Sequence, residues 1–264
     1  MAFDRTRRVS FDGVADLYAE VRPGYPERLF EDVVAFSGIA PSGRILEIGC
    51  GPGNATIPFA ERGFEILGLE LGERMAALAR NRCRGFPRVR VEHVAFEEWP
   101  LERGAFDLVI AASAFHWIEP DVGYPKAAAA LRDGGTLALF WNRTPLDETP
   151  LRSALDAAYR RIAPEIARGG GDGPLPLAAQ IRRTIDEIDA SGAFGPVEVR
   201  RYRWSARHDT ERYLRLLGTH SDHLALPEAS RRDLFEAIRA EIERAGGIIE
   251  RPYLTALHLA RMRR

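Results

Sequence analysis

An apolar run that turns into a glycine-rich loop is the feature that most constrains this chain. Residues 45–48 read ILEI, and three glycines follow at alternate positions from residue 49 to residue 53. The next residues, NATI at 54–57, predict the first turn of a helix. A buried parallel strand that turns sharply onto a helix brings bare backbone close to a nucleotide-like ligand. We therefore expect a cofactor to lie against residues 47–54.

Two acids flank the glycine loop. Glu47 lies two residues before the first glycine, and Glu70 follows the apolar run at 64–69. As parts of a cofactor site, Glu47 would offset an ammonium group directly or through water, while the loop amides face an amino-acid tail. Glu70 would accept both hydroxyls of one ribose, a geometry that suits a carboxylate. The structural alternatives are a buried acid held by loop amides for Glu47 and a solvent-facing strand end for Glu70.

A dinucleotide is the competing ligand for this loop. Its fingerprint, G-x-G-x-x-G, needs a third glycine where Asn54 stands. The acid before the loop, the alternate glycines and the acid after the second strand instead favour a zwitterionic cofactor without a pyrophosphate.

Strands and helices alternate through the first half of the chain. We expect strands at 45–48, 64–69, 89–94, 105–112 and 136–141, helices at 73–82 and 123–132, and a turn at 133–135. Such alternation predicts parallel βαβ units with right-handed crossovers. In the second half, a helix starts at Thr149-Pro150 and a loop spans 167–176. Helices follow at 181–191, 209–220 and 227–245, with strands at 197–204 and 253–261.

The residues that directly follow the early strands are the candidate site. Ligands of an open parallel sheet bind outside the carboxyl ends of its strands. The segments 47–54, 70–71, 95–96 and 113–117 follow four of the expected strands and would form one crevice.

An amphipathic segment precedes the first strand. Apolar side chains recur at helical spacing from residue 11 to residue 21, and the pattern stops at Pro23-Gly24. Tyr18, Arg22 and Tyr25 then have two interpretations. They either pack on the body of the protein or form a lid over the cofactor.

Several segments together resemble the successive motifs of class I S-adenosylmethionine-dependent methyltransferases. They are ILEIGCGPGNAT at 45–56, Glu70, FDLVIAASAFHW at 106–117 and LRDGGTLALFWN at 131–142. FDGVADLYAEVRPGYP at 11–26 and AFHWIEP at 114–120 resemble the small-molecule subgroup that includes trans-aconitate methyltransferase-like proteins. The resemblance runs from residue 11 to residue 142. Glu70 is one departure, because family members commonly have aspartate there.

The resemblance implies a fold and a cofactor. The fold is an α/β, Rossmann-like seven-stranded sheet of order 3-2-1-4-5-7-6, mostly parallel with an antiparallel last strand, and with helices on both faces. The cofactor is S-adenosyl-L-methionine. A single methyltransferase domain would span 1–264, with an N-terminal lid segment at 1–26 and helical additions at 143–194 and 207–247.

The same resemblance assigns residues to the two halves of the site. The cofactor side takes Glu47, Gly49, Cys50, Gly51, Gly53, Asn54, Glu70, Leu71, Ala95, Phe96 and Ser113. The substrate and lid side takes Tyr18, Arg22, Tyr25, His116, Trp117 and Trp141.

His116 is the candidate catalytic residue. An imidazole with an ordinary pKa of ~6.5 would accept a proton from an acceptor hydroxyl near neutral pH. A carboxylate acceptor needs no base, however, because alignment of the two reactants is enough. His116 therefore acts as a general base, as a hydrogen-bonding contact to the acceptor, or only in packing beside Trp117.

Composition narrows the class of partner. The chain has 264 residues, 45% hydrophobic and 28% charged, with a formal net charge of −1, which argues against a nucleic-acid binder. No apolar stretch approaches the ~20 residues of a membrane span, and the charged N-terminus is unlike a signal peptide. We expect a cytoplasmic protein with no membrane partner and leave its oligomeric state open. His220 and His223 flank Asp222, but without a third placed ligand we expect polar helix surface and no metal.

Taken together, these features predict methyl transfer from S-adenosylmethionine to a small-molecule acceptor. Two other functions stay open for the sequence alone. One is an NAD(P)-dependent oxidoreductase on a similar sheet. The other is a regulatory protein that binds the cofactor and catalyses nothing.

Overall fold

A single mixed sheet organises the molecule. The computed structural model describes residues 11–145, 149–167 and 176–263. Its strands are β1 (Arg44–Ile48), β2 (Glu65–Glu70), β3 (Val89–His93), β4 (Phe106–Ala112), β5 (Leu131–Arg143), β6 (Glu198–Asp209) and β7 (Ile248–Arg261). Their spatial order is β3-β2-β1-β4-β5-β7-β6. β7 runs antiparallel to both β5 and β6, and the other pairs are parallel, so the predicted fold class and strand order are confirmed.

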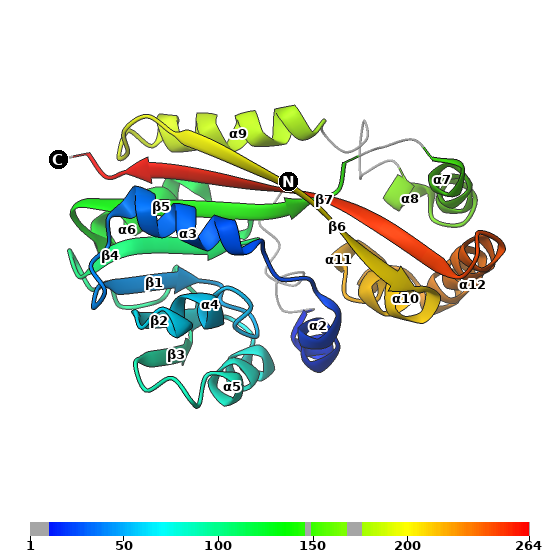
Figure 1. The fold of residues 1–264 in the computed structure, drawn as a ribbon, viewed down its shortest axis with the longest axis horizontal. Helices are drawn as coiled ribbons and strands as arrows, with labels where there is room; N and C mark the ends of the chain where they lie inside the picture. The colour runs from blue at the N-terminus through cyan, green and yellow to red at the C-terminus, as the bar shows by residue number, and fades with distance from the viewer. Residues whose placement is uncertain (1–10, 146–148, 168–175, 264) are drawn as a thin grey trace.

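Helices surround this sheet (Figure 1). The short helices before β1 are η1 (Phe11–Val14), α2 (Ala15–Val21) and α3 (Glu27–Ser37). Between the parallel strands lie α4 (Thr56–Glu61), α5 (Glu73–Arg82), η2 (Phe115–Trp117) and α6 (Pro120–Ala130). The second half contributes α7 (Pro150–Ile162), α8 (Pro164–Ala167), α9 (Leu177–Ala190), α10 (Thr210–Leu217), α11 (Ser221–Leu224) and α12 (Glu228–Arg244).

The apolar runs of the strands feed two cores, one on each face of the sheet. Successive side chains of a strand point to opposite faces, so Ile45 and Leu46 enter different cores. Ile45 packs with Phe30 of α3 and Phe59 of α4, whereas Leu46 belongs to the cluster that α6 and α9 cover. Because both faces are covered, the strands read as continuous apolar segments rather than as alternating ones.

A third core lies away from the centre of the sheet. It joins Leu155 of α7, Leu214 of α10 and Leu234 of α12, and Ile249 at the start of β7 packs against them. In Figure 1, β6 and β7 extend past the other strands to this helical group. The predicted start of α7 at Thr149-Pro150 is confirmed, and the Thr149 hydroxyl caps the helix by accepting a hydrogen bond from the Arg152 amide at 3.1 Å.

The end of α6 differs from expectation. The helix expected at 123–132 ends at Ala130, and residues 131–135 belong to β5 rather than to a turn. The register between β4 and β5 shifts between the pairs Phe106–Leu131 and Leu108–Thr136. Gly134, with φ of 73°, takes part in this bulge, so the strand continues through an apparent turn sequence. Also, β6 runs to Asp209, so the first residues of the addition expected at 207–247 are strand.

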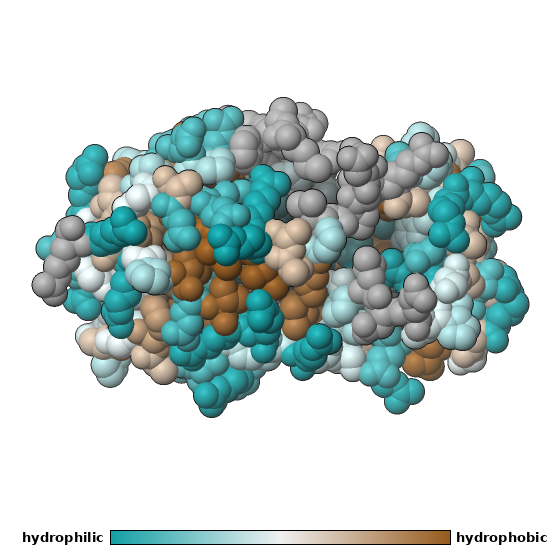
Figure 2. All heavy atoms as spheres, turned by 90° about the horizontal axis from the view of Figure 1, so that it is seen from above, coloured by the Kyte–Doolittle hydropathy of each residue, from teal (hydrophilic) through white to brown (hydrophobic). Residues whose placement is uncertain are grey.

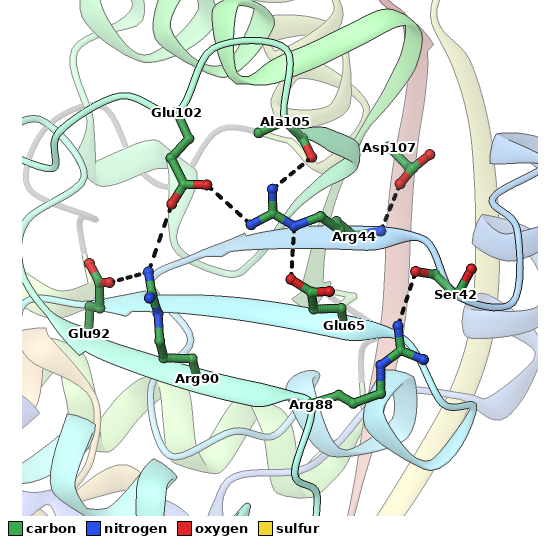
Figure 3. Close-up of polar contacts among 9 residues, drawn as sticks. All are labelled: Ser42, Arg44, Glu65, Arg88, Arg90, Glu92, Glu102, Ala105 and Asp107. Atoms are coloured by element: carbon green, nitrogen blue, oxygen red, sulfur yellow. Dashed lines mark hydrogen bonds and ion pairs between the residues drawn. The ribbon is translucent and has the colours of Figure 1, made fainter.

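A charged network fixes the amino ends of the strands (Figure 3). The Arg44 guanidinium contacts Glu65 at 2.9 Å and Glu102 at 3.1 Å, and it donates to the Ala105 carbonyl. The backbone amide of Arg44 donates to Asp107 at 2.7 Å. These contacts tie β1 to its neighbours at the edge opposite the carboxyl ends of the strands.

Hydrophilic residues cover much of the face seen in Figure 2, with an apolar area between them. Within the described ranges, only Val122 and Ile248 are large apolar residues with high exposure, at 40% and 44%. No described helix has both the length and the apolar character needed to cross a membrane.

Candidate functional site

A cleft of about 400 Å³ opens where the carboxyl ends of β1, β2, β4 and β5 meet. One end is lined by Glu70, Leu71 and Phe96, and the other by His116 and Trp141. A smaller chamber of about 150 Å³ adjoins it along the glycine loop. The expected crevice therefore exists, at the edge of the sheet where open α/β folds bind their ligands.

The glycine loop is held by hydrogen bonds of its own. The amides of Gly49 and Cys50 both donate to the Leu69 carbonyl, at 2.9 and 3.0 Å. The Gly51 amide donates to Glu70 Oε2 at 2.8 Å, and the Gly53 amide donates to the Cys50 carbonyl at 3.0 Å. Protein acceptors thus already engage these four amides, and the expectation that loop amides face an amino-acid tail stays a prediction.

Close packing explains why glycine stands first in the loop. Gly49 has φ of 67°, and a Cβ built on it would lie 2.6 Å from the Cβ of Ala114. Gly51 has φ of 54° but has open space around it, so there only the backbone conformation favours glycine. Ser113, at the end of β4, is the one described non-glycine residue with positive φ, 57°. This strained residue lines the cleft directly beside Ala114.

Glu47 is fully buried beneath the loop. Its Oε2 accepts a hydrogen bond from the Thr56 hydroxyl at 2.6 Å, while its Oε1 has no hydrogen-bond partner. Burial raises the pKa of Glu47 to about 8. The acid is therefore held by a side-chain hydroxyl at the start of α4, and not by loop amides.

Glu70 bridges the two loops that border the cleft. Its two carboxylate oxygens accept hydrogen bonds from the amides of Gly51 and Gly72, each at 2.8 Å. Burial raises the pKa of Glu70, and these hydrogen bonds act in the opposite direction. The Glu70 side chain lines the cleft, so the alternative interpretation of Glu70 as a solvent-facing strand end does not apply.

His116 and Trp141 meet across the other end of the cleft. The indole Nε1–H of Trp141 donates to His116 Nδ1 at 3.0 Å. His116 exposes much of its surface where it lines the cleft. Desolvation by the surrounding protein groups nevertheless lowers its pKa to about 3, with further lowering by the charges of Arg143 and Arg183. The neutral ring therefore carries its proton on Nε2, where it is a hydrogen-bond donor.

The segment before α3 is tied to the body of the protein at several points. Arg22 donates from Nε to the Thr219 hydroxyl at 2.7 Å and from Nη2 to the Thr219 carbonyl at 2.6 Å. The hydroxyls of Tyr25 and Ser113 are 3.0 Å apart. The guanidinium carbon of Arg22 lies 4.9 Å from the ring centre of Tyr18. Residues 1–10 of the expected lid lie outside the described residues.

The three residues His220, Asp222 and His223 differ from the expected polar helix surface. Their potential ligand atoms lie within 4.8 Å of one another, and His223 is buried. Both ring nitrogens of His223 have partners, Asp222 Oδ1 at 2.7 Å and the Tyr159 hydroxyl at 2.8 Å. His220 and Asp222 instead line the cleft.

The structure brings most of the predicted site residues together. Tyr18, Arg22, Gly49, Gly51, Glu70, Leu71, Phe96, Ser113, His116, Trp117 and Trp141 line the cleft. Tyr25, Cys50 and Asn54 line the adjoining chamber. Glu47, Gly53 and Ala95 line neither space.

Two arginines at the site were not anticipated from the sequence. Arg143, at the end of β5, lines the cleft with its guanidinium 5.3 Å from the ring centre of Trp141, and burial lowers its pKa to about 10. Arg251, near the start of β7, lines the chamber. Neither forms an ion pair with any described acid. Arg143 directly follows the motif at 131–142, and this position could have indicated that it belongs to the site. No sequence feature indicated Arg251.

Comparison with known proteins agrees with this architecture. A family model described as a methyltransferase domain matches residues 45–135. A malonyl-[acyl-carrier protein] O-methyltransferase from Geobacter sulfurreducens is 34% identical over 163 residues, covering 60% of this chain and 57% of that protein. These similarities support a class I S-adenosylmethionine-dependent methyltransferase.

Other methyltransferases are similar to parts of the chain. A trans-aconitate 2-methyltransferase from Variovorax paradoxus is 32% identical over 112 residues, 41% of this chain and 42% of that protein. A putative type II methyltransferase from Anaeromyxobacter dehalogenans has the same fold, with a TM-score of 0.61, 23% identity and coverage of 91% and 97% of the two chains. The alignments span about half the length of the curated relatives.

Proposed function

We propose that this chain transfers a methyl group from S-adenosylmethionine to a small-molecule acceptor. One observation carries the proposal. One cleft is lined by Glu70, which would bind a ribose, by the glycine loop and by His116. The cofactor supplies an electrophilic methyl group on a sulfonium, and the chain supplies the alignment of donor and acceptor.

The residues around the first half of the cleft fit this cofactor. Glu70 reaches into the cleft with both oxygens already oriented by two backbone amides, and it would take the ribose hydroxyls. Phe96 and Leu71 provide apolar walls for the adenine. Gly51 lines the cleft with open space around it, so a ligand can approach the loop backbone there without a side chain between them.

The second half of the cleft fits an acceptor with an acid group. The Nε2–H of His116 is a donor, and Arg143 brings a buried positive charge without an acid partner among the described residues. A carboxylate would satisfy both. Relatives named for malonyl-[acyl-carrier protein] and trans-aconitate, which are carboxylic acids, support this choice. His116 then orients the acceptor and removes no proton.

The N-terminal segment and the helical additions would enclose the acceptor within a single domain. Tyr18 and Trp117 both line the cleft, and both contact Phe11, with ring centres 6.0 and 6.1 Å away. A closed site excludes water and strengthens the electrostatic contacts within it. Residues 11–26 are in this proposal a cover held by Arg22 and Tyr25.

The test is transfer of a labelled methyl group to a panel of small carboxylic acids and matched amides. We expect product only with acids, and a KM at least tenfold higher for Arg143→Gln with little change in cofactor affinity. Binding of S-adenosylhomocysteine without any methyl transfer across a broad metabolite panel would instead favour a regulatory protein.

A further inference from the structure

Two polar side chains from the second half of the chain line the cleft. They are His220, directly before α11, and Asp222 within it. Asp222 does not line the chamber along the glycine loop, and neither residue follows one of the strands that form the cofactor half. This position favours contacts to the methyl acceptor over contacts to the cofactor.

A buried histidine fixes the carboxylate of Asp222. Burial raises the pKa of the Tyr159 hydroxyl, which therefore keeps its proton and donates to His223 Nε2 at 2.8 Å. The proton of the His223 ring is then on Nδ1, which donates to Asp222 Oδ1 at 2.7 Å. The backbone amide of His223 donates to the same oxygen at 2.8 Å. The orientation of Asp222 is thus determined from behind the wall of the cleft.

These bonds make Asp222 a fixed negative charge. Burial raises its pKa, but the hydrogen bonds from His223 outweigh this effect and hold the pKa below its ordinary value. Asp222 Oδ2 has no hydrogen-bond partner among the described residues, and 51% of the side-chain surface is exposed. A ligand in the cleft can therefore reach this oxygen.

His220 adds a neutral hydrogen-bond acceptor beside this charge. A ring nitrogen of His220 lies within 4.8 Å of a carboxylate oxygen of Asp222, and no described residue forms a hydrogen bond with the His220 ring. Desolvation lowers the pKa of His220 well below its ordinary value, and the charges of Arg22 and Arg251 add to this effect. One nitrogen of the neutral ring therefore has a lone pair available to a donor in the cleft.

The other charged side chains on the cleft differ in how far protein groups engage them. Both oxygens of Glu70 accept backbone amides, and Asp12 accepts a hydrogen bond from an amide of α5 at 2.9 Å. Arg22 donates from two nitrogens to the residue that follows α10 and its loop glycine. This leaves the cation Arg143 and the anion Asp222, and neither forms an ion pair with another charged side chain in the described ranges.

We propose that Asp222 and His220 bind an amino group of the methyl acceptor, which is therefore an amino acid whose carboxylate binds His116 and Arg143. The inference rests on the proposed function and names the substrate class of that site. An ammonium group donates to both hydrogen-bond acceptors and offsets the charge of Asp222, whereas a second carboxylate would be repelled. The cleft thus selects against dicarboxylic acids of the same length.

Calorimetry on the protein saturated with S-adenosylhomocysteine tests this substrate class without turnover. The probes are 4-aminobutanoate, 4-hydroxybutanoate and butanedioate, with longer homologues of each. For the wild type, we expect an amino acid to bind at least about tenfold more tightly than the dicarboxylic acid of equal length. The hydroxy acid should fall between them, because it donates a hydrogen bond but carries no charge.

Two variants remove the two contacts separately. In Asp222→Asn, we expect the amino acid to bind about 10- to 100-fold more weakly and the dicarboxylic acid to bind no more weakly than before. His220→Phe keeps the charge and loses only the second hydrogen-bond acceptor, so the amino acid should bind about 3- to 10-fold more weakly. The affinity for S-adenosylhomocysteine should stay within about twofold in both variants.

A matched control and the contrary outcomes complete the design. Asp233→Asn removes an exposed acid of α12 that does not line the cleft, and it should change no affinity. Circular dichroism establishes that each variant is folded. The assignment is overturned if no amino acid of the panel binds, if dicarboxylic acids bind as tightly, or if Asp222→Asn weakens S-adenosylhomocysteine as much as the amino acids. If amino acids bind through Asp222 but none receives a labelled methyl group, the proposed function fails while this assignment stands.

Discussion

Trp141 donates its indole N–H to His116 Nδ1 at 3.0 Å, and this contact determines what His116 offers to an acceptor. Since Nδ1 is already an acceptor, the neutral imidazole presents an N–H at Nε2. The arrangement favours a hydrogen-bonding contact to the acceptor over a general base. Both functions were open for the sequence alone.

Substitution of His116 separates a donor from a base. In His116→Gln, the amide oxygen can accept from Trp141 while the amide N–H₂ still donates, so we expect kcat/KM within about tenfold of the wild type. His116→Leu lacks the donor and should lose about 100-fold or more. Steady-state kinetics with a labelled methyl donor makes the comparison. An equal and large loss in both variants would indicate that His116 is a base after all.

The pH profile gives an independent readout of the same residue. The pKa of His116 is lowered to about 3, so the ring stays neutral throughout the range from pH 5 to pH 9. We therefore expect the wild type to show no change in kcat/KM near pH 6.5 that comes from titration of His116. His116→Gln should have the same pH profile in that region. A wild-type limb in that region, absent from the variant, would contradict the neutral-donor role.

Replacing Trp141 tests its role as a positioning residue. Trp141→Phe removes the N–H that occupies His116 Nδ1, so the ring can adopt either tautomer and rotate more freely. We expect kcat to fall about 3- to 30-fold with the cofactor affinity unchanged. Nitrogen NMR of the His116 ring should report a mixture of tautomers in the variant and a single Nε2–H form in the wild type.

Glu47 should make the folded state less stable as pH rises. Its folded pKa of about 8 lies above the ordinary value of 4.5, so the folded protein holds a proton between these values that the unfolded chain has released. Stability is therefore fully present below pH 4.5 and falls as pH approaches 8. Glu47→Gln stays neutral, and we expect it to be more stable than the wild type by about 1–3 kcal/mol at pH 8, with little difference at pH 5.

Urea unfolding at the two pH values measures this difference. Glu61→Gln, which neutralises an exposed acid at the end of α4, is the matched control and should show the pH dependence of the wild type. A Glu47→Gln curve that stays parallel to the wild type from pH 5 to pH 8 would mean that Glu47 is ionised in the folded protein.

The close approach of Gly49 to Ala114 predicts a specific rescue. Gly49→Ala places a methyl group 2.6 Å from the Ala114 Cβ and also strains a backbone with φ of 67°. Gly51→Ala has the strain alone, worth about 1–2 kcal/mol. We expect Gly49→Ala to lose about 1–3 kcal/mol more stability than Gly51→Ala, because overpacking adds to the strain. The double variant Gly49→Ala/Ala114→Gly should return to the level of Gly51→Ala, and unfolding curves that show no such return would exclude the contact as the cause.

Local sequence patterns predicted much of the fold because each element carries its own signal. The apolar run at β1 and the helix α5 lie where their periodicity places them, and the second half follows the expected order. Residues 133–135 were predicted to form a turn, since DGG is typical of a turn in isolation, but they belong to β5. The pairs Phe106–Leu131 and Leu108–Thr136 lie on both sides of that sequence and include it in β5 as an irregularity, and only the assembled sheet supplies those partners.

The site was predictable where its residues follow strands directly, and less so where distant segments meet. Glu70 and Ser113 lie in the cleft because the ends of parallel strands share one edge. The bond between Trp141 and His116 depends on side chains 25 residues apart. Arg251 stands in the segment ERPY, which carries no motif, and reaches the chamber only because β7 lies in the sheet beside β5.

Isothermal titration of the purified protein with S-adenosylhomocysteine and, separately, with NADH tests the central claim most directly. We predict a single saturable site for S-adenosylhomocysteine and no measurable binding of NADH, because Glu70 can bind one ribose and Asn54 stands where a dinucleotide loop needs its third glycine. Absence of heat with S-adenosylhomocysteine, or equal affinity for NADH, would contradict the account.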